Sequence, residues 1–304
     1  MVCGEKINQR IKRNRKIMET PNYKEANALW SSFRDDVLFK QRFFLNHPFL
    51  DRLAEIARTL GIRIDPGKIY YRARIIDDNA VMEHMLGKCY GPDSTEEERK
   101  WYHSKANKFK GLSKEGSYVP TDTKLIRDAR SNPKFIRYLY VAESPTTAVY
   151  EVRPILYSAV NIAGIEVKEP LKIANLAVDI DLSAVKEKSI DEWLLGFVQS
   201  AFSSPTNNPD DYIPSQIIAG FFRSLGYDGI RYSSSLHEGG FNLTIYDVSK
   251  CEAVFSTDMR FEKMKISLRP AIGAENTDVR FQWIKDNVPM RWDNDAKKLV
   301  EAEV

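Results

Sequence analysis

The sequence predicts an α+β fold in which a small helical unit precedes a mixed β core with flanking helices. Residues 23–60 carry apolar side chains at helical spacing, whereas the chain from residue 69 onward is dominated by runs that alternate like strands. Helical segments interrupt these strands irregularly, which favours α+β over a doubly wound parallel sheet. The length of 304 residues allows one substantial domain and a smaller one.

The N-terminal unit is expected to span residues 1–62. Lys and Arg side chains crowd its first sixteen positions against a single acid, Glu5. We interpret this stretch as a solvated basic arm, with contact to nucleic acid or another anionic partner as the alternative. The helical pattern is interrupted at His47-Pro48, and Gly61 stands where a helix C-cap glycine is expected.

The second region is expected to form one domain over residues 68–263. Its predicted strands are 69–76, 138–142, 162–167, 173–180, 229–232, 241–246 and 253–256, and its predicted helices are 145–152, 190–202 and 214–225. A polar segment over residues 87–130 is interpreted as a long loop with one helix at 96–108. Residues 264–304 pattern weakly and are expected to form a C-terminal extension that is partly frayed.

Composition argues for an ordinary globular protein without a resident metal. The net charge of +3 is too small to indicate nucleic acid or membrane as a partner. Three cysteines (Cys3, Cys89 and Cys251) and four histidines show neither disulfide nor metal-ligand spacing. No secretory segment or apolar run of about 18 residues is visible, so we expect a cytoplasmic protein.

The strand at Ile69–Ile75 has two distinct faces. Ile69, Tyr71, Ala73 and Ile75 lie on one face, which is expected to be a core stripe, and Tyr70, Arg72 and Arg74 lie on the other. Two guanidiniums on one face suit a bidentate grip on phosphates. The alternative is a solvent-facing strand surface.

A short helix at residues 145–152 places a carboxylate in an unfavourable position. Ser144 is at the N-cap and Pro145 at the first helical position, while Pro154 prevents continuation. Glu151 therefore falls in the last turn, where the helix dipole disfavours a carboxylate. A residue that breaks a local rule points to function, and the alternative is a surface neighbour pair of Glu151 with Arg153.

A third motif follows the turn at Gly226 and ends in three hydroxyls. Alternation puts Ser234 on one strand face, and the next strand begins so that Asn242 can lie near it. No Ser-His-acid triad is available, because His237 is three residues away with no orienting acid. Ser234 is therefore expected to be a positioning hydroxyl, unless this is only a serine-rich turn, and Ser233 is its close rival.

Together, in this order, these motifs resemble the RES-domain family over about residues 68–250. The matching runs are Tyr71-Arg72-Ala73-Arg74, Arg130-Ser131-Asn132-Pro133, Tyr138–Ala142, Thr147–Pro154, Gly226–Ser234 and Gly240–Leu243. The family is named for an Arg, a Glu and a Ser, which look like Arg72, Glu151 and Ser234. One departure is Ala129, where the family usually has Gly before the second Arg.

The resemblance implies an ADP-ribosyltransferase-like fold and an enzyme that cleaves NAD⁺, by hydrolysis or phosphorolysis, as a toxin or defence effector. Glu151 would stabilise the positive charge that develops on the ribose, and Arg72 and Arg130 would hold the pyrophosphate. Tyr138 or Tyr71 would stack on nicotinamide, with Tyr138 preferred because strict alternation puts Tyr71 opposite Arg72. Ser234 would bond the nicotinamide ribose or carboxamide, with Asn242 behind it.

The expected partners are NAD⁺ as substrate, inorganic phosphate, an antitoxin or inhibitory protein, and a second copy of the chain. No metal and no membrane are expected. Three alternatives stay open: mono-ADP-ribosylation of a protein, a catalytically inactive NAD⁺-binding regulator, and a HEPN-type ribonuclease using Arg42 and His47. The last rests on an Arg-x4–6-His spacing that also recurs at Arg231 and His237.

Overall fold

The structure is a computed structural model, and it divides the chain into two units, residues 1–262 and 263–304, which are described separately. The described residues are 18–43, 45–76, 91–108, 113–156, 158–177, 188–206, 208–261, 283–285, 288–293 and 298–301. The predicted basic arm lies outside them. Within these ranges, no helix has the length and apolar character needed to cross a membrane.

The described part of the first unit contains, in chain order, helix α2 (Pro21–Asp35), a π-helical turn η1 (Asp36–Lys40) and helix α3 (Pro48–Ala57). A proline opens each α-helix at a position where its missing N–H costs nothing. Gly61 differs from its prediction as a cap, because it starts strand β1 (Gly61–Ile64). This strand pairs with β5 and so ties the helical region to the main sheet.

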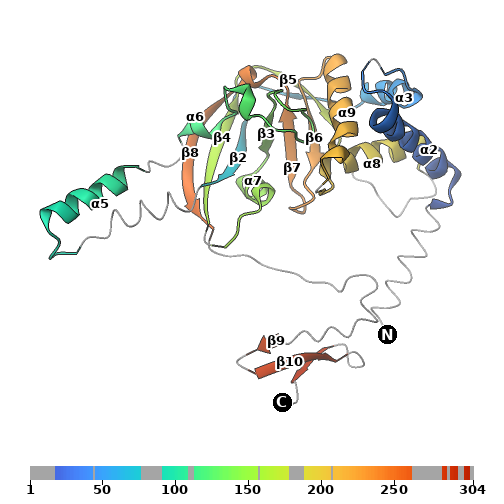
Figure 1. The fold of residues 1–304 in the computed structure, drawn as a ribbon. Coiled ribbons are helices and arrows are strands. Elements are labelled where there is room, and N and C mark those ends of the chain that lie inside the picture. Colours follow the sequence, from blue (N-terminus) through green and yellow to red (C-terminus); the bar gives the residue numbers. More distant parts are fainter. Residues whose placement is uncertain are drawn as a thin grey trace. The chain divides into compact units, whose positions relative to one another are not determined.

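One eight-stranded sheet forms the centre of this unit, in the order β1-β5-β6-β7-β3-β2-β4-β8. All neighbouring pairs are antiparallel except β5 and β6. The mixed sheet with flanking helices confirms the α+β prediction (Figure 1). The remaining strands are β2 (Ile69–Ile75), β3 (Leu139–Ala142), β4 (Ala159–Val167), β5 (Leu171–Asn175), β6 (Gly229–Ser233), β7 (Phe241–Ile245) and β8 (Cys251–Arg260).

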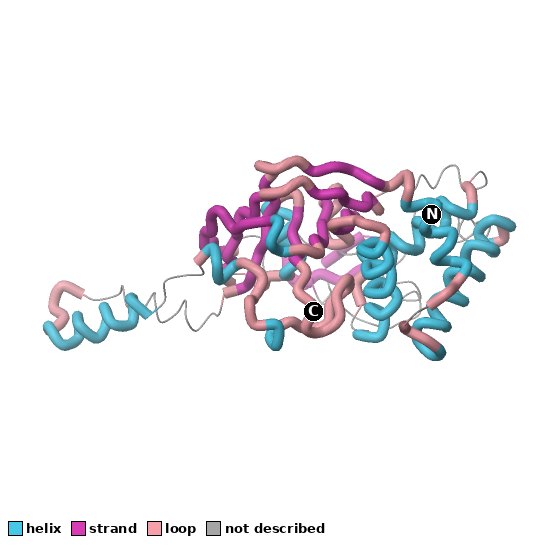
Figure 2. Tube along the Cα trace, turned by 90° about the horizontal axis from the view of Figure 1, so that it is seen from above, coloured by secondary structure: helices cyan, strands magenta, loops and turns pink. Residues whose placement is uncertain are grey.

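Helices lie beside this sheet at several places. Helix α7 (Pro145–Val152) packs on β2, β3 and β4, and α8 (Ile190–Ser203) and α9 (Tyr212–Ser224) pack on β6 (Figures 1 and 2). Helix α2 packs on α8, so the N-terminal helices share a core with the sheet. The other elements are α5 (Glu96–Lys108), α6 (Lys114–Ser117), η2 (Thr123–Leu125), η4 (Pro209–Asp211) and η5 (Val248–Lys250).

Strand β2 is covered on both faces, which differs from the single core stripe expected for it. Tyr70 is buried in a cluster with Val119, Leu139 and Leu243, among others. Ala73 is buried on the opposite face, in a cluster that includes Ala148 of α7. Ile69 and Ile75 are 37% and 48% exposed, because they lie at the ends of the strand, beyond both clusters.

The described part of the second unit is a three-stranded antiparallel sheet. Its strands are β9 (Trp283–Lys285), β10 (Val288–Asp293) and β11 (Lys298–Glu301), with β10 in the centre. The sequence predicted only a weakly patterned extension here, because these strands are short and their apolar residues do not alternate regularly.

Candidate active site

Glu151 lies in the last turn of α7, as the punctuation of the sequence predicts. The Ser144 side chain accepts a hydrogen bond from the Thr147 N–H at the helix start, and Arg153 ends the helix. The dipole cost of a carboxylate in this turn is offset by side chains from other elements. Glu151 Oε1 accepts hydrogen bonds from Ser234 Oγ at 2.6 Å and from Asn242 Nδ2 at 2.7 Å.

The order of the strands brings these three residues together. Asn242 on β7 pairs with Ala142 on β3, the strand that leads into α7. On its other side Asn242 pairs with Tyr232 on β6, two residues before Ser234. Sheet register therefore places Ser234 and Asn242 beside the same carboxylate oxygen.

The surroundings of Ser234 fix the direction in which its hydroxyl donates. Its Oγ accepts hydrogen bonds from the backbone N–H groups of Leu236 (3.2 Å) and His237 (3.1 Å). Since both of these contacts use the oxygen as acceptor, the hydroxyl proton is directed to Glu151. This arrangement suits a positioning hydroxyl, whose proton is held by the carboxylate.

The His237 ring anchors the loop that follows Ser234 onto α7. Its Nδ1 lies 2.9 Å from Thr147 Oγ1, and its ring stacks on Tyr150 with the centroids 4.9 Å apart. Gly240 allows this approach, because a Cβ there would lie 2.8 Å from the His237 ring. The loop and the helix that carry Ser234 and Glu151 thus hold each other in place.

A pocket of 390 Å³ opens in front of this group. It is lined by Arg130, Tyr140, Glu151, Arg153, Phe202, Ser203, Thr206, Tyr212, Tyr232, Ser233, Ser235, Leu236 and Asn242. Among the described residues none donates a hydrogen bond to Glu151 Oε2. One oxygen of Glu151 is therefore held by the fold, and the other is available to a ligand.

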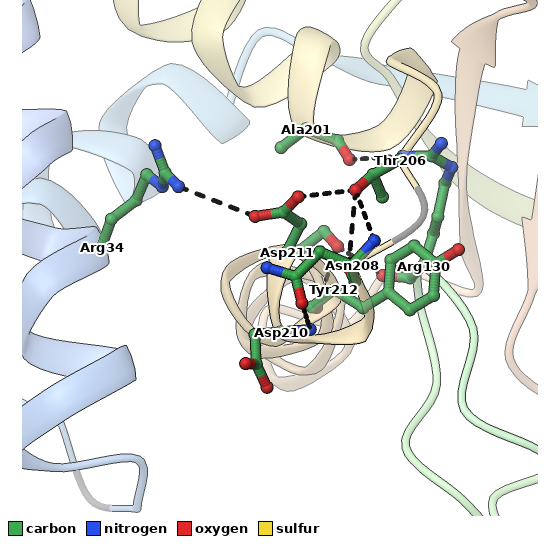
Figure 3. Close-up of polar contacts among 9 residues, drawn as sticks. Arg34, Arg130, Ala201, Thr206, Asn208, Asp210, Asp211 and Tyr212 are labelled. Atoms are coloured by element: carbon green, nitrogen blue, oxygen red, sulfur yellow. Dashed lines mark hydrogen bonds and ion pairs between the residues drawn. The ribbon is translucent and has the colours of Figure 1, made fainter.

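Arg130 lies in the wall of this pocket and is anchored to the C-terminal end of α8. Its Nη1 donates to the Ala201 carbonyl at 3.2 Å (Figure 3). Its Nη2 donates to the Ser204 carbonyl. The guanidinium also lies 5.6 Å from the centre of the Tyr212 ring. A cation at the C-terminus of a helix is favoured by the helix dipole, which holds Arg130 in place.

The same wall is linked to the N-terminal helices. Thr206 Oγ1, on the pocket rim, donates to Asp211 Oδ2 at 2.6 Å, and Arg34 of α2 lies 3.9 Å from the other Asp211 oxygen (Figure 3). Both side chains of this ion pair are more than 40% exposed, so the contact is a weak one.

The backbone around Arg130 is held from three sides. Ser215 Oγ donates to the Arg130 carbonyl at 2.6 Å, and Gln216 Nε2 donates to the Ala129 carbonyl at 2.9 Å. Tyr140 accepts from the Ser131 N–H and donates to Asn132 Oδ1. Ala129 is not among the described residues with positive φ, so its side chain is accommodated without backbone strain.

Arg72 and Tyr71 are placed on opposite faces of β2. Tyr71 packs in the cluster that includes α7, whereas Arg72 shares the face of Tyr70, away from α7. Arg72 Nη1 is buried and has no hydrogen-bond partner in the described part of the chain. Its burial and the nearby charge of Arg74 lower the pKa of Arg72 to about 10. Neither Arg72 nor Tyr71 lines the Glu151 pocket.

Tyr138 also lies away from the pocket, and the sequence interpretation missed the aromatic residues that line it. Tyr138 is 7% exposed, and its ring packs 4.8 Å from that of Tyr246. Tyr140, two residues later on the same strand face, lines the pocket with Tyr232. Burial raises the pKa of Tyr232 to about 12, so its hydroxyl is protonated at neutral pH. Strand alternation predicts that Tyr140 lies on the same strand face as Tyr138, but it does not predict which of the two lines a pocket.

His47 has a structural role at the start of α3. Its Nδ1 accepts from the Phe49 N–H at 3.0 Å, and its Nε2 lies 3.2 Å from Ser32 Oγ. Arg42 donates to the Val37 carbonyl at 3.2 Å. Both ring nitrogens of His47 are occupied within the fold, which offers no support for a ribonuclease centre.

The described residues contain no group of three or more His, Cys, Asp or Glu side chains arranged to hold a metal ion. The polar groups of the pocket are guanidiniums, hydroxyls, an amide and one carboxylate, which together offer hydrogen-bond donors and acceptors to a ligand.

Comparisons with known proteins point to one family. A family model described as RES domain matches residues 101–262, a region that contains Arg130, Glu151, Ser234 and Asn242 and begins after Arg72. No curated protein matches the chain. A solved structure, the M. tuberculosis MbcT-MbcA toxin-antitoxin complex, contains a chain with 13% identity and a TM-score of 0.35, over 69% of this chain and 92% of that one.

Proposed function

Because this chain belongs to the RES-domain family, we propose that it is an enzyme that cleaves NAD⁺ at the nicotinamide–ribose bond in the Glu151 pocket. The observation that carries the proposal is the hydrogen bonding of the Glu151 carboxylate, which differs between its two oxygens. One of its oxygens accepts hydrogen bonds from Ser234 and Asn242, and the other is available within a pocket lined by Arg130.

Glu151 suits the charge that this reaction develops. Nicotinamide leaves as a neutral molecule with the electron pair of the glycosidic bond, so the ribose becomes positive and the leaving group needs no proton. A carboxylate fixed beforehand stabilises such an oxocarbenium-like state without reorganising during the step. Water then attacks the same carbon to give ADP-ribose and a proton, or inorganic phosphate attacks to give ADP-ribose-1″-phosphate.

Other pocket residues account for recognition of the rest of the substrate. Arg130 is the guanidinium that the fold holds in the wall, and we assign it to the pyrophosphate. Tyr140 and Tyr232 line the same pocket, and we assign the nicotinamide ring to this aromatic side of it. Arg72, Tyr71 and Tyr138 remain proposals from the sequence alone, since none of them lines this pocket.

We propose that this activity depletes NAD⁺ as a toxin or defence effector does, with an antitoxin or inhibitory protein as partner. The family resemblance supports this role. Transfer of ADP-ribose to a protein would use the same carboxylate and differs only in the acceptor.

One incubation tests the reaction and its acceptor. Purified protein is mixed with NAD⁺, with and without inorganic phosphate, and the products are separated and weighed by mass spectrometry. Free ADP-ribose, ADP-ribose-1″-phosphate or an ADP-ribosylated protein identifies water, phosphate or protein as the acceptor. Intact NAD⁺ under all conditions would refute the proposal.

Glu151→Gln is the matched variant, and it is expected to lower NAD⁺ cleavage by at least about a hundredfold, because its amide has no charge. Glu55→Gln on α3, whose side chain is 64% exposed, is the control and should retain full activity. Thermal unfolding of both variants checks that the fold is intact. Full turnover by Glu151→Gln would remove this residue from the chemistry.

A further inference from the structure

Arg153 adopts a backbone conformation that is unusual for its residue type. It ends α7 with φ 48° and ψ 58°, in the left-handed region. Among the described residues only Phe135 and Arg153 have positive φ without being glycine. Glycine usually occupies this position after a helix, because its lack of a Cβ removes the steric cost.

The next residue makes the conformation of Arg153 still less favourable. Pro154 follows directly and is buried. A proline pushes the residue before it toward extended backbone and away from helical conformations. Strain of this kind persists only where the surrounding structure enforces it, and it is concentrated at functional sites.

The strained turn lies at the wall of the pocket. Arg153 lines the same 390 Å³ space as Glu151, two residues earlier in the chain. The two form no ion pair, and Arg153, an exposed residue, has no side-chain hydrogen bond or ion pair with any other described residue. Arg130 differs, since two of its nitrogens donate to carbonyls of the α8 end.

Among the residues that line the pocket, guanidiniums therefore outnumber carboxylates. The pocket is lined by one carboxylate, Glu151, and two guanidiniums, Arg130 and Arg153. An unpaired guanidinium presents a planar set of donors that matches the oxygens of a phosphate group.

We propose that Arg153, together with Arg130, binds the diphosphate of the dinucleotide and selects substrates that carry this anion. This inference rests on the proposed function, since it assigns a residue to the same pocket. The backbone strain at Arg153 is the structural cost of directing its guanidinium to the ligand.

The test compares Arg153→Gly with the wild-type protein on two substrates. Glycine relieves the left-handed strain, so the thermal midpoint should stay level or rise. The KM for NAD⁺ should rise roughly tenfold or more, with kcat little changed, because a remote binding contact is lost. Cleavage of nicotinamide riboside, which has no phosphate, should be the same in both proteins.

Two further variants separate charge from strain. Arg153→Lys keeps the charge but loses the paired donors, so its KM should lie between the other two. Phe135→Gly removes the other strained residue, which does not line the pocket, and should leave KM unchanged. An unchanged KM in Arg153→Gly, or an equal loss of activity on nicotinamide riboside, overturns the inference.

A binding measurement separates this inference from the proposed function. Calorimetric titration with ADP-ribose reports anion binding without any turnover. If the wild-type protein binds ADP-ribose and Arg153→Gly loses this affinity while NAD⁺ stays intact, then the inference holds and the cleavage proposal fails. If Glu151→Gln stops cleavage but Arg153→Gly binds ADP-ribose normally, then only the inference fails.

Discussion

Replacing Ser234 by alanine tests whether the hydroxyl acts through Glu151. The change removes the hydrogen bond from Ser234 Oγ to Glu151 Oε1, which is 2.6 Å long and has a charged acceptor. Such bonds contribute about 1.5–3 kcal/mol. If all of this free energy serves to hold the carboxylate for the reaction, kcat falls roughly 10- to 150-fold.

The same substitution has a separate effect on stability. The backbone N–H groups of Leu236 and His237 lose their acceptor, and both residues are half-buried. Leaving such donors without a partner costs about 1–3 kcal/mol, and water reaching the loop reduces this figure. Urea unfolding measures the loss independently of activity.

Steady-state kinetics with NAD⁺ distinguish the possible roles of Ser234. A fall in kcat with little change in KM indicates that Ser234 positions the carboxylate, whereas a rise in KM alone indicates direct contact with the substrate. Ser234→Thr keeps the hydroxyl and should recover most of the activity. Unchanged kinetics in Ser234→Ala would refute the reasoning.

Asn242 provides a second check through a double-mutant cycle. Because Asn242 and Ser234 donate to the same oxygen of Glu151, the combined loss in Ser234→Ala, Asn242→Leu should be smaller than the product of the two single losses. Independent effects would mean that the two residues do not act through one carboxylate.

Three other predictions concern the fold around the site. Arg231 donates to both oxygens of Glu143 (2.6 and 3.2 Å) and to Asn175, so Arg231→Lys, which loses the paired donors, should lower the free energy of unfolding by about 1–3 kcal/mol in urea. The pKa of Tyr232 is raised to about 12 by burial, so between pH 10 and 12 the unfolded chain releases this proton first and stability falls as pH rises. A shift of this size corresponds to roughly 3 kcal/mol, and Tyr232→Phe should make the alkaline loss of stability, followed by circular dichroism, less steep. Burial also raises the pKa of the Cys251 thiol to about 12, so iodoacetamide should label this cysteine only after the protein unfolds. Peptide mass mapping detects the label. Rapid labelling of Cys251 in the native protein would contradict this prediction.

Much of the local structure was predictable from the sequence, because it depends on near neighbours in the chain. Helix α7 spans the predicted residues 145–152, since a capping serine and two prolines fix its ends. Most strands appear where alternating side chains predict them, within a few residues at each end. The short strand β1 was missed, because a glycine at position 61 is also typical of the end of a helix.

The candidate site was predictable only in part. The unfavourable helix position of Glu151 and the end of the strand before Ser234 are local features, and both residues meet in one hydrogen bond. The choice between Tyr138 and Tyr140 was not local, because alternation places both on one strand face and only packing separates a core ring from a pocket ring. Arg153 was interpreted from the sequence only as a possible surface partner of Glu151, and its place in the pocket wall is a result of the tertiary structure.

The sequence by itself determined most of the helices and strands between residues 69 and 260, the family the chain resembles and the carboxylate at the end of α7. Only the tertiary structure decided what surrounds that carboxylate. Ser234 and Asn242 are 83 and 91 residues from Glu151, and the order of β3, β7 and β6 brings them to it. The same sheet turns Arg72 to the opposite face. Strand order and register arise from hydrogen bonds and packing between distant segments, and no local pattern encodes these contacts.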